Sequence, residues 1–140
     1  MVHFLDTNIF VYSFDDRDKR KQQRARSLIV DALSSNDGLI SFQVVQEFIS
    51  VATRKFATPL TAQDCGRYLD EVLAPMCEVF PSIALYHQAL DVHQRWQLSF
   101  YDALIVAAAL QGDCSVLYTE DLHHGLKIQA LTVTNPFIAD

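Results

Sequence analysis

Residues 4–12 read Phe4-Leu5-Asp6-Thr7-Asn8-Ile9-Phe10-Val11-Tyr12, which places one acidic residue between two apolar runs. The first run, residues 2–5, has the length and composition of a short buried strand. Similar short apolar runs occur at residues 39–41, 77–80 and 115–118, with a weaker one at 131–134. The segments between them have helical periodicity. Short apolar strands that alternate with helices predict an α/β fold with a central, mostly parallel sheet of about five strands flanked by helices.

The helical segments show the spacing of amphipathic helices. One apolar stripe, at positions 25, 28, 29, 32 and 33, is followed by Asn36-Asp37-Gly38, a typical helix end. Residues 103–110 are apolar on every side and predict a central, buried helix. The chain has 140 residues, half of them hydrophobic, and shows no repeat or linker. We therefore expect a single three-layer domain over residues 1–140.

The composition excludes several classes of protein. A net charge of −6, from 17 acidic and 11 basic residues, argues against binding nucleic acid through bulk charge alone. The three cysteines show no CxxC spacing, which excludes a cysteine-rich zinc site and suits a reducing compartment. No apolar run approaches the ~20 residues of a membrane span. We expect a cytoplasmic protein that is not bound to a membrane.

Acidic residues occupy four places where the surroundings are apolar. They are Asp6, Glu47, Asp102 and the adjacent pair Glu120-Asp121. Each has a structural interpretation, because Asp6 could cap a helix, Asp102 could complement a helix dipole, Glu47 could face solvent and Asp121 could lie in a loop. These interpretations do not explain a shared location. The carboxyl ends of parallel strands open onto one crevice, and we expect the four acids to meet there.

Clustered carboxylates require a counterion. Two of them ~5 Å apart repel by roughly 3 kcal/mol at an effective dielectric of 20. An all-oxygen ligand set suits Mg²⁺, with Mn²⁺ as a substitute, and such an ion can activate water for phosphodiester hydrolysis. Thr7, Asn8 and Thr119 would support these ligands from the same edge of the sheet, although turn chemistry would explain Thr7 and Asn8 equally well.

Basic residues concentrate in one segment. Six of the 11 bases lie within residues 17–26. Candidate contacts to RNA phosphates are Arg17, Lys19, Arg20 and Lys21, with Arg54 and Lys55 further along the chain. The alternative is that residues 17–26 form the solvated start of a helix. His123 and His124 are more typical of a loop than of a catalytic centre.

At its acidic positions the sequence resembles a known family. Asp6-Thr7-Asn8, Glu47 in a helix, Phe100-Tyr101-Asp102-Ala103 and Thr119-Glu120-Asp121 resemble the acidic signature of PIN-domain ribonucleases, in particular the VapC-type toxins of toxin–antitoxin pairs. The likeness extends from Phe4 to Phe137. Tyr101 stands where many relatives carry Trp.

The resemblance implies a Mg²⁺-dependent endoribonuclease in which Asp6, Glu47, Asp102 and Asp121 are the catalytic, metal-binding residues. Glu120 competes with Asp121 for the fourth position, because the two are adjacent. The family also implies an RNA substrate, a homodimer and a small antitoxin partner. We expect the antitoxin to bind an exposed apolar groove at residues 44–52 and 68–73.

Two other functions stay open on the sequence. An aspartate-based phosphoryl-transfer enzyme would also place an Asp after the first strand, but Asn8 stands where such phosphatases carry a second Asp. A PIN-like binding module without catalytic activity would usually have lost an acidic position. Metal-dependent RNA cleavage and phosphorylation assays distinguish these functions from the nuclease.

Overall fold

The computed structural model describes residues 1–138 and forms one α/β domain. Its strands are β1 (His3–Leu5), β2 (Gly38–Ser41), β3 (Cys77–Val79), β4 (Val116–Tyr118), β5 (Lys127–Ile128) and β6 (Leu131–Thr134). Its helices are α1 (Thr7–Tyr12), α2 (Lys19–Ser35), α3 (Phe42–Ala52), α4 (Ala62–Tyr68), α5 (Ala74–Met76), α6 (Ile83–Trp96) and α7 (Phe100–Gln111), and a π-helical turn, η1 (Leu69–Leu73), joins α4 to α5.

The sheet has six strands in the order β3-β2-β1-β4-β6-β5. All neighbouring pairs are parallel except β5 and β6, which form an antiparallel hairpin. The chain builds outward from β1 through β2 to β3, then returns to the other side of β1 to add β4. This reversal places a topological switch point between β1 and β4, where α/β sheets of this kind bind ligands.

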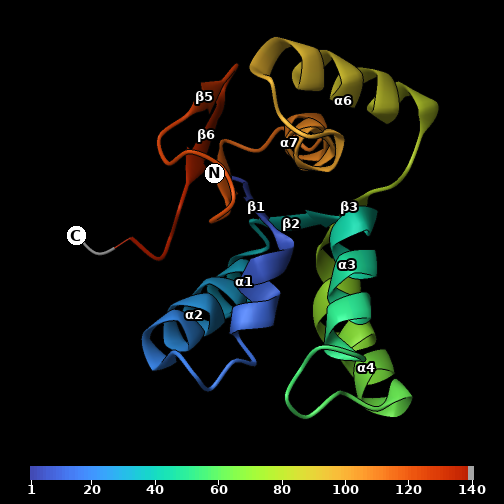
Figure 1. Ribbon diagram of the computed structural model, residues 1–140, viewed down its shortest axis with the longest axis vertical. Helices are drawn as coiled ribbons and strands as arrows, with labels where there is room; N and C mark the ends of the chain where they lie inside the picture. The colour runs from blue at the N-terminus through green and yellow to red at the C-terminus, as the bar shows by residue number, and fades with distance from the viewer. Residues whose placement is uncertain (139–140) are drawn as a thin grey trace.

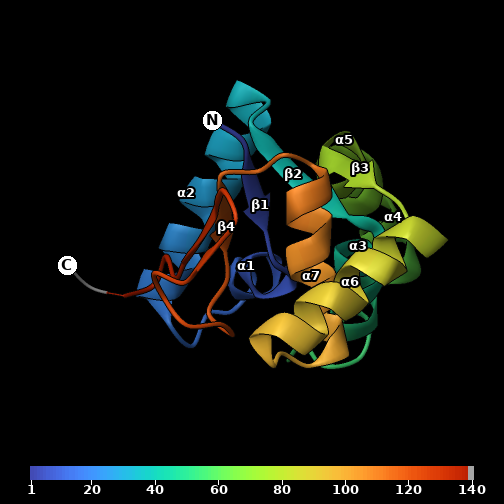
Figure 2. The same cartoon turned by 90° about the horizontal axis from the view of Figure 1, so that it is seen from above.

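Helices cover both faces of the sheet. In Figure 1, α6 and α7 lie on one side of the strands and α1 to α4 on the other. Figure 2 looks down onto the α6–α7 side, with α7 directly over the strands. Seven consecutive residues of α7, Ala103 to Ala109, are buried. The predicted three layers and the central helix are thus confirmed.

Local sequence signals explain where several helices begin and end. The Thr61 hydroxyl accepts a hydrogen bond from the backbone N–H of Asp64 and begins α4 (3.1 Å). Asn36 ends α2 in the left-handed conformation, with a φ of 59°.

None of the helices described within residues 1–138 has the length and apolar composition needed to span a membrane.

The prediction that residues 44–52 and 68–73 form an exposed apolar groove for an antitoxin is wrong. In α3, the apolar face of Val44, Val45, Phe48 and Ala52 is buried in the core. The ring of Phe48 stacks on Tyr68, with ring centroids 4.9 Å apart. The apolar face of α3 is therefore part of the core, and Tyr68 of α4 packs on it through Phe48.

Candidate functional site

Asp6 is the centre of a polar network at the switch point. It follows β1 directly and begins α1, where its Oδ1 accepts a hydrogen bond from the Thr7 backbone N–H (2.7 Å). Its Oδ2 accepts a hydrogen bond from the buried Thr119 hydroxyl (2.7 Å). Thr119 follows β4, so the contact joins the two strands that flank the switch point. The capping interpretation of Asp6 is correct, and the same side chain also reaches across to β4.

Ionising the Asp6 carboxyl costs more free energy in the folded protein than in water. The residue is only 7% exposed. Burial raises its pKa to about 6, against the lowering effect of the bonds from Thr119 and Thr7, and the negative charges of Asp121 and Glu47 raise it further. With a pKa of about 6 the Asp6 carboxyl is still mostly ionised at neutral pH, but its ionisation costs more free energy than in water, and a bound cation would offset that cost.

Glu47 and Asp121 join the network from different elements. The Thr7 hydroxyl donates to Oε1 of Glu47 on α3 (2.7 Å). The Thr119 hydroxyl accepts from the Asp121 backbone N–H (3.1 Å), which places Asp121 beside it. Thr7 and Thr119, expected only as supporting residues, are thus the links between the acids.

Asp102 reaches the same region from the first turn of α7. Partial burial raises the pKa of Asp121, and the negative charges of Asp102, Glu120 and Glu47 raise it further, while a hydrogen bond from the Asn8 side chain opposes the rise. The four predicted acids therefore influence one another through space. Within residues 1–138, however, no three acidic, histidine or cysteine side chains converge closely enough to form a ready-made set of metal ligands.

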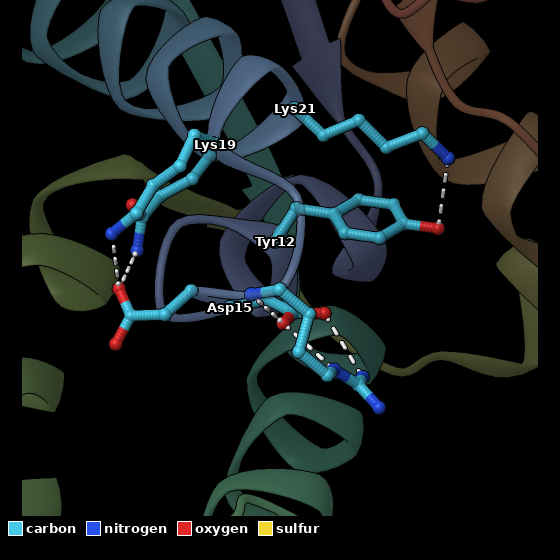
Figure 3. A network of polar contacts seen from close by, with 7 residues as sticks. Tyr12, Asp15, Lys19 and Lys21 are labelled. Carbon is cyan, nitrogen blue, oxygen red and sulfur yellow. Dashed lines mark hydrogen bonds and ion pairs between the residues drawn. The ribbon is translucent and has the colours of Figure 1, made fainter.

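Glu120 points away from this group of acids. Its carboxylate accepts hydrogen bonds from the Tyr12 hydroxyl and from Nζ of Lys21, the latter at 2.8 Å. Partial burial raises the pKa of Glu120, but the bonds from Lys21 and Tyr12 outweigh it and hold the pKa below its usual value. Figure 3 shows the Lys21 side chain extended alongside Tyr12, with Nζ directed at the hydroxyl. The positive charge of Lys21 thus balances the negative charge of Glu120.

Two buried oxygen atoms at this edge have no hydrogen-bond partner: Oδ1 of Asn8 and Oγ of Ser41. Ser41 ends β2 and lines a separate hollow with Phe42, Gln43 and Val79. Of the two residues, only Asn8 is linked to the acids, and the sequence had named it as a supporting residue. The unpartnered Oδ1 of Asn8, whose side chain bonds to Asp121, can accept from the water shell of a hard cation, so the residues present fit Mg²⁺ or Mn²⁺.

The predicted basic contacts divide into three groups. Arg17 and Lys19 form surface ion pairs with Asp15 and Asp16, at 3.0 and 3.2 Å, and Figure 3 labels one member of each pair, Asp15 and Lys19. Lys21 lies beside Glu120, and Arg20 binds the carbonyl of Phe137. Arg54 and Lys55 are exposed in the turn after α3, away from these contacts. RNA binding by these six residues stays a prediction.

Several solved structures share the fold of this chain. A toxin–antitoxin complex from Klebsiella pneumoniae has a TM-score of 0.67 at 20% identity, over 96% of this chain and 97% of that one. FitAcB from Neisseria gonorrhoeae has a TM-score of 0.62 at 19% identity, over 97% and 99%. VapC20 from Mycobacterium tuberculosis, a toxin that cleaves the sarcin–ricin loop, has a TM-score of 0.59 at 19% identity, over 85% and 89%.

These structural likenesses fall below 25% identity and show a shared fold. Among curated proteins, no sequence matches this chain. A family model does match: the PIN domain model aligns with residues 3–125, a range that contains all four predicted acids. The chain belongs to the PIN domain family.

Proposed function

We propose that this protein is a metal-dependent endoribonuclease and the toxin of a toxin–antitoxin pair. The observation that carries the proposal is the position of Asp6, a buried carboxylate with a pKa raised to about 6, linked through Thr119 and Thr7 to further acids at the switch point. A buried carboxylate beside further acids costs free energy of folding, so a purely structural role would not favour it. The same arrangement provides negative oxygen ligands for a cation.

Asp6, Glu47, Asp102 and Asp121 would hold Mg²⁺ or Mn²⁺, partly through water molecules, because Mg²⁺ keeps several waters and takes few direct carboxylates. When bound, the ion supplies an activated water and balances charge on the leaving oxygen. Thr119 and Thr7 keep the carboxylates oriented by their hydrogen bonds. Asp121 takes the fourth position in this proposal, because Glu120 is already paired with Lys21.

Partners follow from the family likeness. One of the similar structures is a toxin–antitoxin complex and another is a toxin, and on this ground we expect a small antitoxin partner for this chain. Unpaired RNA is the expected substrate, because a splayed single strand presents its backbone more freely than a duplex. A homodimer stays a prediction of the resemblance.

The test is cleavage of an unpaired RNA by purified protein. We expect cleavage with millimolar Mg²⁺ or Mn²⁺, none in excess EDTA, and a fall of more than about 100-fold for Asp6→Asn, since removing even the outer partners of metal ligands costs 10–100-fold. Asp91→Asn, which removes an exposed acid on α6, is the matched control and should cleave at the wild-type rate. Undiminished cleavage in EDTA would contradict the metal-dependent mechanism.

A further inference from the structure

A second polar hollow lies beside the last strand, outside the group of acids. It has a volume of about 400 Å³ and lies between α2 and the segment that follows β6. In Figure 1 these two segments lie on the same side of the molecule. Arg20, Arg24, His124, Thr134 and Asn135 provide its polar lining. None of them carries a negative charge.

The two arginines are held in place by backbone oxygens. Nη2 of Arg20 donates to the carbonyl of Phe137 (2.8 Å), and Nε of Arg24 donates to the carbonyl of Pro136 (3.2 Å). A guanidinium has five N–H donors, so each arginine keeps further donors for a ligand. No carboxylate within residues 1–138 forms an ion pair with either one. In a chain of net charge −6, these two positive charges have no counterion in the described part of the fold.

The remaining lining residues are oriented as donors as well. Nδ1 of His124 accepts a hydrogen bond from the Asn135 backbone N–H (3.0 Å), so the neutral imidazole carries its proton on Nε2. Oδ1 of Asn135 accepts from the Phe137 backbone N–H (2.9 Å), which leaves the amide NH₂ as its free group. The hollow therefore offers guanidinium, imidazole and amide donors, a set that selects an anion.

The hollow is close to the group of acids. The carbonyl of Thr134 accepts from the backbone N–H of Thr119, whose hydroxyl contacts Asp6 (3.1 and 2.7 Å). The end of β6 is two strands away from β1, which corresponds to roughly 10 Å at the usual strand spacing. A single RNA strand can therefore reach both places.

We infer that this hollow binds a backbone phosphate of the RNA whose neighbouring phosphodiester is cut at the group of acids. The inference rests on the proposed nuclease function and names the residues that hold its substrate. Arg20 and Arg24 both belong to the basic segment at residues 17–26, but only Arg20 was among the candidate phosphate contacts, and His124 was assigned to a loop. Arg17 and Lys19, by contrast, are 90% and 69% exposed at their side chains and already paired with acids.

The test measures binding of a short unpaired RNA in EDTA, where no cleavage occurs, over a range of salt concentrations. For the double variant Arg20→Gln/Arg24→Gln we expect at least about tenfold weaker binding and a log–log salt slope shallower by about 0.7 to 1.4, the value for one or two phosphate contacts on a single strand. Arg67→Gln/Arg95→Gln also removes two positive charges, from exposed positions on α4 and α6, and should bind as wild type. An unchanged slope in the double variant overturns the inference.

A second measurement separates phosphate binding from anchoring of the segment after β6. Inorganic phosphate should raise the melting temperature of the wild type and of Arg20→Lys/Arg24→Lys, which keeps both charges, but not that of the glutamine variant. If phosphate stabilises only the wild type while all variants bind RNA equally, the hollow binds another anion and the RNA assignment is wrong. Failure of the wild type to cleave any RNA with Mg²⁺ counts against the proposed function alone, because these binding assays need no cleavage.

Discussion

Two adjacent acids, Glu120 and Asp121, have opposite electrostatic surroundings. Glu120 is bound by Lys21 and Tyr12, whereas Asp121 faces the negative charges of Asp102 and Glu47. Because Glu120 and Asp121 lie in a loop, no helical or strand periodicity shows which way each side chain points. The choice between them depends on Tyr12 and Lys21, which are 108 and 99 residues away from Glu120 in sequence. Tyr12 and Lys21 come next to Glu120 only in the folded protein, so the sequence alone could not show this contact.

This contrast gives a prediction at the residue scale. Asp121→Asn should lower RNA cleavage by more than about tenfold, because it removes a charge that helps to hold the cation. Glu120→Gln should change cleavage by no more than a few-fold, because the amide still accepts a hydrogen bond from Tyr12. Initial cleavage rates at saturating Mg²⁺ measure both. The reverse order of effects would assign the fourth metal-binding position to Glu120.

At the start of α7, Ser99 and Asp102, three positions apart, have different roles. Ser99 caps the helix, with its hydroxyl accepting from the Asp102 backbone N–H (3.2 Å). The Asp102 carboxylate is therefore not the cap of α7, although it lies in the first turn, where a negative charge favours the helix dipole.

A pair of variants separates these roles. Ser99→Ala should lower the free energy of unfolding by about 1 kcal/mol with and without Mg²⁺, because it removes only the cap. Asp102→Asn should leave the metal-free protein equally or more stable, because it relieves repulsion with Asp121, and should gain less stability from Mg²⁺ than the wild type. Chemical unfolding with and without Mg²⁺ measures both. A destabilised Asp102→Asn with wild-type cleavage would make Asp102 a structural residue.

Most elements could be predicted from the sequence, and the exceptions have physical causes. The five predicted strands are present because each is a short run with apolar residues buried in the core. The hairpin of β5 and β6 has only two residues in β5, and its turn places Gln129 at a φ of 56° in place of the usual Asn-Gly signal. The π-helical turn η1 lies within a stripe that reads as an ordinary α-helix. Tertiary packing, and not local sequence, therefore determines the β5–β6 hairpin and the η1 turn.

At the scale of the whole molecule, the topology determines where the acids meet. Asp6 comes from β1, Asp121 from the segment after β4, Glu47 from α3 and Asp102 from α7. Sequence order alone separates Asp6 from Asp121 by more than a hundred residues, and only the insertion of β4 beside β1 makes Thr119 a bridge between them. The sequence could predict that these acids lie at one edge, because a parallel sheet collects its strand ends there, and their joint binding of a metal stays a prediction. It could not predict which hydroxyls connect the acids.

The raised pKa of Asp6 makes stability depend on pH. In the folded protein its pKa is about 6, against 3.8 for an unperturbed aspartate, so the folded state binds this proton more tightly than the unfolded chain does. The metal-free protein should therefore lose stability as the pH rises from about 4 to about 6, by about 3 kcal/mol from this group.

The Asp6→Asn variant isolates that contribution, because Asn cannot ionise and the Thr119 hydroxyl can bond to its amide. Other carboxylates titrate in both proteins, so the expected result is the difference between two urea-unfolding series. Relative to Asp6→Asn, the wild type should become less stable as the pH rises through this range in EDTA. With millimolar Mg²⁺ the difference should shrink above pH 6, because a bound cation stabilises the ionised carboxylate of the folded state. Parallel stability curves for the two proteins in EDTA would show that Asp6 ionises as readily in the fold as in water, and would remove the electrostatic reason for a cation at this site.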